Sequence, residues 1–232
     1  MRKTLVLSAV IVLSAVLTTP GVQGQAAAPA PAQTQKPTQP MSFFITSVPI
    51  GMGANFGGLT GADAHCTKLA SAAGSTGKTW RAYLSQTQAG DQPAINARDR
   101  IGTGPWYNAK GQLIASNVAD LHGDQQRDRN NIRKPTALNE KGGMVNGVGD
   151  MPNQHDMVTG SDSTGRALLG NAANTTCGNY TSSDMGSVML GHHDRLGGAN
   201  ASWNATHSSA ACSQEALVKT GGAGLFYCFA AN

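Results

Sequence analysis

Histidine and aspartate stand side by side at two places in the second half of the chain, as His155-Asp156 and as His192-His193-Asp194. Imidazole nitrogens and carboxylate oxygens are donors that bind divalent metals, and the same pair of groups can transfer protons during hydrolysis. Neighbouring residues on an extended segment point to opposite faces, so His192 and His193 should not bind one ion together. We take His192 and Asp194 as candidate metal ligands; the alternative is a set of histidines that only satisfy hydrogen bonds in turns.

The short motifs of common hydrolases and of nucleotide-binding proteins are missing from the sequence. No Gly-x-Ser-x-Gly segment occurs, and the glycine-rich stretch 221–224 lacks the lysine and the following helix of a phosphate-binding loop. We therefore expect a protein that is not an enzyme. A periplasmic hydrolase that uses a His–Asp pair is kept as an alternative.

The composition predicts a domain rich in loops. The 232 residues include 29 glycines, and only 13% of the residues are charged, compared with about 25% in an average domain. So little charge excludes a coiled coil and a disordered polyelectrolyte. Acidic residues interrupt the basic ones, so no continuous stripe for binding nucleic acid is present.

The amino-terminal segment has the pattern of an export signal. Two basic residues precede an apolar run, Thr4 to Leu17, which is shorter than the roughly 20 residues that span a membrane. We predict a signal peptide at 1–24, a linker rich in Ala, Pro and Gln at 25–41, and one folded domain at 42–232. The expected location is secreted or periplasmic, with no membrane span.

Four cysteines lie in the predicted domain: Cys66, Cys177, Cys212 and Cys228. An even number of cysteines in an exported protein favours two disulfides. The sequence alone leaves all three connectivities open.

Hydrophobic periodicity predicts a mixed α+β fold with a small antiparallel sheet. A helix should begin at Thr60, whose hydroxyl would cap it, and end at Gly74. The remaining predicted elements are strands at 42–48, 79–85, 112–115, 156–160 and 224–230, a short helix at 93–100, and a long loop at 116–153.

The segments Gly61-Ala62-Asp63-Ala64-His65-Cys66 and Trp80-Arg81-Ala82-Tyr83-Leu84-Ser85 resemble the opening of the endostatin domain of collagens. Matches in the same order continue at 98–100, at 160–166 and at the three later cysteines. The chain is also similar to bacterial exported proteins of endostatin-like fold, some of which, in spirochaetes, bind host matrix proteins and complement regulators. The resemblance implies a C-type-lectin-like fold with paired terminal strands and nested disulfides, Cys66–Cys228 outside Cys177–Cys212. The resemblance does not imply a zinc site in this chain. The zinc site of endostatin uses histidines near the amino terminus, and this sequence has no histidine before His65.

Sugar-binding C-type lectins hold calcium through a Glu-Pro-Asn or Gln-Pro-Asp loop and a Trp-Asn-Asp strand, and two segments here are partly similar. Asp150-Met151-Pro152-Asn153 keeps Pro-Asn, and Trp203-Asn204-Ala205 has alanine where the carboxylate is expected. Calcium needs six to eight oxygens, so the lost carboxylate weakens such a site. No cofactor is expected, and a calcium- or metal-dependent lectin is kept as an alternative.

The sequence thus predicts a non-catalytic exported module that recognises an extracellular glycan or a matrix or host protein through polar loops at 116–156 and 192–207. The ligand-binding candidates are Asp150, Asn153, Asp156, Trp203 and Asn204.

Overall fold

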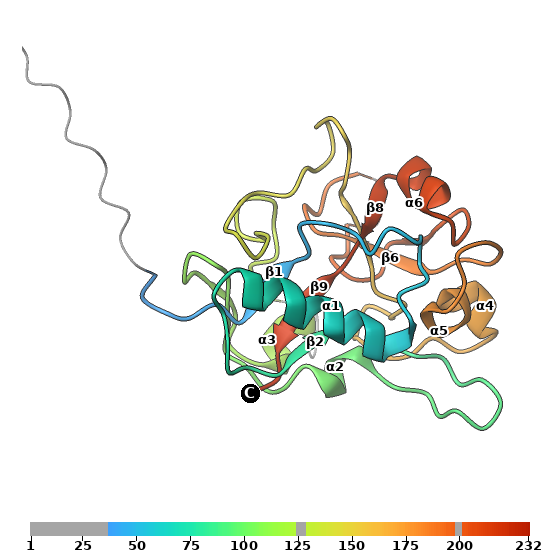
Figure 1. Ribbon diagram of the computed structural model, residues 1–232, viewed down its shortest axis with the longest axis horizontal. Coiled ribbons are helices and arrows are strands. Elements are labelled where there is room, and N and C mark those ends of the chain that lie inside the picture. Colours follow the sequence, from blue (N-terminus) through green and yellow to red (C-terminus); the bar gives the residue numbers. More distant parts are fainter. Residues whose placement is uncertain (1–36, 124–128, 198–200) are drawn as a thin grey trace, which may run out of the picture. The chain divides into compact units, whose positions relative to one another are not determined.

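The computed structural model describes residues 37–123, 129–197 and 201–232. The predicted signal peptide and most of the predicted linker lie outside these residues. The described part is a mixed α+β fold with small, mainly antiparallel sheets and short helices (Figure 1). None of its described helices is both long enough and apolar enough to cross a membrane.

Six helices and nine strands follow one another in the described residues. In chain order they are β1 (Phe43–Ile45), α1 (Gly58–Ala72), β2 (Trp80–Ala82), α2 (Ala97–Arg100), β3 (Trp106–Tyr107), β4 (Leu113–Ala115), α3 (Val118–His122), β5 (Asp156–Val158), α4 (Ala172–Thr175), α5 (Cys177–Tyr180), β6 (Met189–His192), β7 (His207–Ser208), α6 (Gln214–Thr220), β8 (Gly222–Leu225) and β9 (Tyr227–Ala230).

The sheet of β1, β9 and β2 separates two hydrophobic cores. β9 lies between the other two strands and pairs antiparallel with both. Side chains alternate between faces along a strand, so Phe44 and Cys228 join the core that includes the buried side of α1. Phe43 and Phe229 join the second core, which includes Trp203. β9 is therefore buried on both faces along its whole length.

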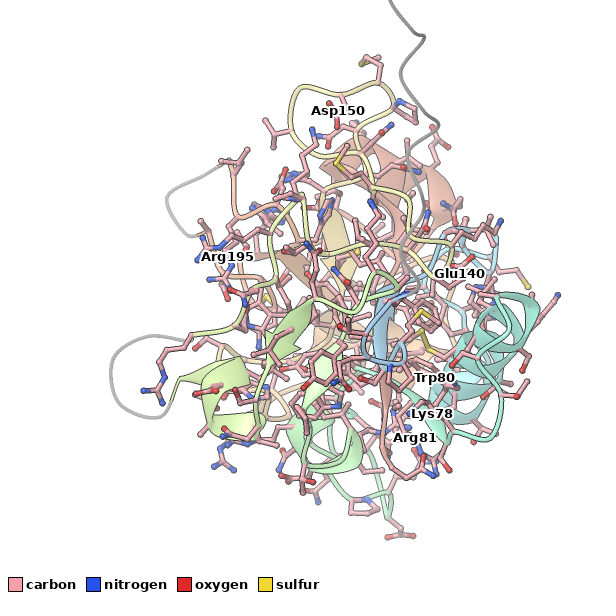
Figure 2. The ribbon with its side chains drawn as sticks, turned by 90° about the vertical axis from the view of Figure 1, so that its left-hand side faces the viewer. Lys78, Trp80, Arg81, Glu140, Asp150 and Arg195 are labelled. Atoms are coloured by element: carbon pink, nitrogen blue, oxygen red, sulfur yellow. A yellow bond between two sulfur atoms is a disulfide. The ribbon has the colours of Figure 1, made fainter. Side chains whose placement is uncertain are left out.

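A buried carboxylate fixes α1 against β2. Asp63 of α1 accepts a hydrogen bond from the Ala82 amide at 2.9 Å and pairs with Arg81 at 2.8 Å and Arg100 at 2.6 Å. Trp80 and Arg81 are neighbours on β2 (Figure 2), where Trp80 is buried and Arg81 is partly exposed. Because the two side chains lie on opposite faces of β2, the strand contributes Trp80 to the core and Arg81 to the ion pair with Asp63.

The second large sheet has the strand order β7-β6-β5-β8. β5 pairs antiparallel with β6 and parallel with β8, and β6 pairs antiparallel with β7. Figure 1 shows β6 and β8 on the side of the fold where α6 lies. A third, two-stranded sheet joins β3 and β4. The second sheet positions the candidate site.

The two disulfides are nested, as the resemblance implied. Cys66–Cys228 joins α1 to β9, and Cys177–Cys212 joins α5 to the segment before α6. Because Cys228 lies on the central strand of the first sheet, the outer disulfide ties that strand to the helix that covers it.

Several predicted elements differ from the observed ones. The helix predicted from Thr60 begins at Gly58, and its N-cap is Gly57, a left-handed residue that makes no side-chain cap. The hydroxyl of Thr60 is therefore not the cap, and that prediction was wrong. The predicted loop 116–153 contains α3, and β6 and α6 were not predicted.

We expect the outer disulfide to contribute more to stability than the inner one. The outer disulfide links cysteines 162 residues apart, and the inner disulfide links cysteines 35 residues apart. Chain entropy predicts that they contribute about 5 and about 4 kcal/mol to the free energy of unfolding. The double variants Cys66→Ala/Cys228→Ala and Cys177→Ala/Cys212→Ala should both lower the free energy of unfolding, the first by more. Urea unfolding followed by circular dichroism measures this; equal stability of wild type and the first variant would contradict it.

Candidate metal centre

Strands β5, β6 and β7 each bring one polar side chain to the same face of the second sheet. Asp156 on β5 is paired with His192 on β6, and His207 on β7 is paired with Leu190 on β6. Leu190 and His192 are two residues apart on one strand, so their side chains share a face. Directly paired residues also share a face, with Cβ atoms about 4.5–5.5 Å apart. His155, just before β5, completes the group.

Four donor atoms converge in this cluster of His155, Asp156, His192 and His207. Asp156 Oδ1 lies 3.3 Å from His155 Nε2, 3.2 Å from His192 Nε2 and 3.5 Å from His207 Nε2. The Nε2 atoms of His192 and His207 are 3.0 Å apart. Zinc binds imidazole nitrogen and carboxylate oxygen at about 2.0–2.2 Å in a tetrahedron, which separates neighbouring donors by roughly 3.3 Å. His155, Asp156 and His192 each offer one ligand atom within 4.8 Å of the other two, which suits one ion. His207 lies beside two of these three, Asp156 and His192.

The carboxylate of Asp156 is buried without a hydrogen-bond donor. Its side chain is 1% exposed, and neither of its oxygens accepts a hydrogen bond from any residue that the structure describes. Removing a carboxylate from water is costly unless another charge or several donors replace the lost hydration. A cation between Asp156 and the three imidazoles would supply that charge.

One imidazole of the cluster, that of His207, has a hydrogen-bond acceptor at Nδ1, which leaves the lone pair on its Nε2 for a metal. His207 Nδ1 donates to the carbonyl oxygen of Ser208 at 3.2 Å. His155 Nδ1 faces Asp194 Oδ1 at 3.6 Å, an ionic contact that is longer than a hydrogen bond. Acceptors of this kind commonly orient metal-binding histidines. The rings of His155 and His192 also pack together, with centroids 4.1 Å apart.

Asp194, predicted as a ligand, lies behind His155 and does not join the four donors. Its carboxylate accepts hydrogen bonds from the amides of Val148 at 2.7 Å and Leu196 at 3.1 Å. Burial alone would raise the pKa of Asp194, but the contact with His155 and these two amides outweigh it, so the pKa is lowered. The same carboxylate raises the pKa of His155. Asp194 thus orients a ligand and anchors the loop that contains Val148.

His193 points away from the cluster. It is fully buried, and its Nε2 donates to the carbonyl oxygen of Asn146 at 3.0 Å. Burial lowers the pKa of His193, which keeps the ring neutral. His192 and His193 therefore have separate roles: one lies among the metal donors and the other holds the loop before β5.

Two glycines leave space for the cluster. A Cβ atom on Gly221 would lie 2.9 Å from His155 Nε2, and one on Gly222 would lie 2.9 Å from the Cβ of Asp156. Gly221 also has a left-handed backbone, with φ of 128°, which disfavours other residues. In the turn from α6 into β8, glycine therefore suits both the backbone conformation and the small space beside the donor atoms.

The residues predicted to bind calcium or sugar do not form a common site. Asp150 Oδ2 pairs with Lys134 at 2.5 Å and accepts from the Gly147 amide; the hydrogen bond from Lys134 lowers the pKa of Asp150. Figure 2 shows Asp150 in a loop at the edge of the fold. The side chain of Asn153 accepts from the His155 amide at 3.2 Å.

Trp203 and Asn204, predicted as ligand contacts, are fully buried in the structure. Trp203 packs against Tyr83 and Tyr227. The Asn204 side chain donates to the Tyr83 hydroxyl at 2.9 Å. Trp203 is thus one of the large rings that fill this core, and the buried amide of Asn204 is satisfied by hydrogen bonds, including those to the carbonyls of Asp162 and Ser163.

His155, Asp156 and His207 were not among the predicted metal ligands, which were His192 and Asp194. The pair His155-Asp156 was noted, but Asp156 was predicted only as a contact for an extracellular ligand. His207 lies on a strand of two residues, too short for a periodic signal, and only the strand register brings it near Asp156.

The comparisons with known proteins give no family. A scan against protein-family models finds no match, and a search of curated proteins also finds none. The geometry of the cluster is therefore the basis for any statement about function.

We expect Gly221→Ala to destabilise the protein more than Gly74→Ala. Both glycines have positive φ, but a Cβ on Gly74 would have no neighbour within 4 Å. Left-handed strain should cost about 1 kcal/mol at both positions, and the overlap with His155 should add about 1–3 kcal/mol at Gly221. Thermal unfolding of both variants in chelator measures the difference; equal melting temperatures would mean that Gly221 does not pack closely against the cluster.

Proposed function

We propose that this chain is an exported metal-binding protein, and that Asp156, His155, His192 and His207 hold one Zn²⁺ ion. The observation that carries the proposal is the convergence of three imidazole Nε2 atoms on one buried carboxylate oxygen, at 3.2–3.5 Å. An arrangement without metal would leave the two facing nitrogens of His192 and His207, 3.0 Å apart, to share a single proton. It would also leave Asp156 without a hydrogen-bond donor among the described residues.

The donor set favours zinc over calcium. Calcium takes six to eight oxygen ligands at about 2.3–2.6 Å, whereas this cluster offers three nitrogens and one carboxylate at spacings that suit a smaller, four-coordinate ion. Imidazole is a ligand of zinc, copper, iron and nickel. We select zinc because it takes four nitrogen and oxygen ligands and has no preference for a planar arrangement.

The C-type-lectin-like fold and export belong to the same proposal. Nested disulfides and the antiparallel pairing of β1 with β9 support the fold. Two disulfides with no free cysteine support an oxidising compartment outside the cytosol. Recognition of an extracellular glycan or matrix protein, without catalysis, stays a prediction; the burial of Trp203 and Asn204 removes two of its five candidate residues.

Zinc should raise the melting temperature of metal-stripped protein, whereas calcium and magnesium should leave it unchanged. At a free zinc concentration 100 times Kd the folded state gains about 2.7 kcal/mol, which corresponds to roughly 5–10 °C for a domain of this size. Calorimetric titration should give one ion per chain. His65→Ala, which removes a histidine outside the cluster, is the matched control and should respond as wild type does. Failure of zinc to bind would end the proposal.

Asp156→Asn should affect the two states of the protein in opposite ways. In chelator the variant should be at least as stable as wild type, because an amide replaces a buried charge and can donate to a neighbouring imidazole. With zinc present it should lose most of the metal-dependent stabilisation. Urea unfolding with and without zinc measures both effects. If Asp156→Asn in chelator is strongly destabilised, Asp156 is one member of a structural ion pair with a protonated histidine and not a metal ligand.

A further inference from the structure

The four donors of the candidate centre differ greatly in exposure. The side chains of Asp156, His192 and His155 are 1%, 3% and 9% exposed, whereas that of His207 is 37% exposed. Three donors therefore lie inside the protein, and the fourth closes the cluster from the solvent side.

The four donors also differ in how firmly the fold holds them. Asp156 and His192 face each other across the β5–β6 pair, inside a four-stranded sheet. The ring of His155 packs against that of His192 with its plane tilted by 33°, and its Nδ1 lies 3.6 Å from Asp194 Oδ1. His207 lies on the two-residue edge strand β7, which pairs with β6 alone.

Among the residues that the structure describes, His207 has few contacts outside the cluster that hold its ring. The hydrogen-bond acceptor at its Nδ1 is the carbonyl of the next residue, Ser208, which constrains the ring less than a partner from another element would. Its ring meets that of His192 edge-on, with centroids 5.0 Å apart. Rotation of the His207 side chain into solvent would therefore break few contacts.

The buried donors form a complete group without His207. One ligand atom from each of His155, Asp156 and His192 lies within 4.8 Å of the other two. Three protein ligands with a fourth, exchangeable position are the arrangement of zinc sites that bind external ligands, whereas four fixed protein ligands mark structural sites.

We propose that His207 is a displaceable ligand, and that an external carboxylate takes its position on the metal. The proposal rests on the proposed zinc function. The bond between the metal and His207 Nε2 breaks and a bond to a carboxylate oxygen forms, with no change of oxidation state. Zn²⁺ with the single carboxylate of Asp156 carries a net charge of about +1, which favours an anion over a neutral ligand as the replacement.

Cobalt in place of zinc makes the exchange visible, because the absorption of Co²⁺ in the visible range reports its ligands. The full chain with both disulfides formed is stripped of metal, loaded with one equivalent of Co²⁺, and titrated with acetate and, separately, with azide. We expect a saturable spectral change in wild type with both anions. Sodium chloride at equal ionic strength controls for screening.

Variants separate a displaceable ligand from a fixed one. His207→Ala should still bind Co²⁺, with affinity lowered roughly 100-fold, one ligand's share of a four-ligand site. It should also bind acetate at least about 10-fold more tightly than wild type, because no imidazole competes. His192→Ala should bind no Co²⁺ at micromolar concentrations, and His65→Ala should match wild type. Near-ultraviolet circular dichroism in chelator verifies that each variant is folded.

Two results would overturn this inference while leaving the zinc site intact. One is a wild-type Co²⁺ spectrum that acetate and azide do not change. The other is loss of Co²⁺ binding in His207→Ala as complete as that in a folded His192→Ala. Absence of Co²⁺ and Zn²⁺ binding in wild type would instead overturn the proposed function itself.

Discussion

The carboxylate of Asp156 is the constraint around which the second sheet is arranged. It lies on β5, which has a neighbouring strand on each side, and its oxygens accept no hydrogen bond from the described residues. The adjacent glycines, Gly221 and Gly222, add no side chain that could donate. What surrounds the carboxylate is imidazole. A protein that buries a charge in this way needs a counter-charge in the same place.

The rest of the fold brings these distant residues into register. Asp156, His192 and His207 come from three separate strands, so the cluster exists only when the sheet has formed. The disulfide Cys177–Cys212 ties the segment before β6 to the segment after β7. Both strands that carry a cluster histidine therefore lie within one covalent loop, which limits how far β6 and β7 can separate. The inner disulfide thus serves the site more directly than the outer one.

The sequence predicted those parts of the fold that have local signals. Alternating side chains indicated β2, β-branched and aromatic residues indicated β1, and helical spacing indicated α1. Short strands were also predicted near β4 and β5, and the single strand predicted at 224–230 is divided between β8 and β9. The start of α1 was missed because a left-handed Gly57, and not a hydroxyl side chain, precedes it. The histidine–aspartate cluster was only partly predictable. His192 was a metal candidate because of its neighbours in sequence, whereas the position of His207 depends on the pairing of Leu190 with a two-residue strand. Register between short strands is a property of tertiary packing that no local pattern encodes.

The uneven burial of the four donors follows from where the sheet ends. Interior strands bury the side chains on their covered face, whereas an edge strand of two residues leaves its side chain next to solvent. A site at the boundary between the interior and the edge of a sheet therefore combines two kinds of donor. Several donors are surrounded by neighbouring side chains and strands, and one donor has few neighbours. In the proposed centre, the interior donors would set how strongly an ion is held, because displacing them would require the sheet to open. The edge donor would set how easily the ion can be reached, because only one side chain would need to move. A centre placed inside the sheet would lack that access, and one placed wholly on the edge would lack that rigidity.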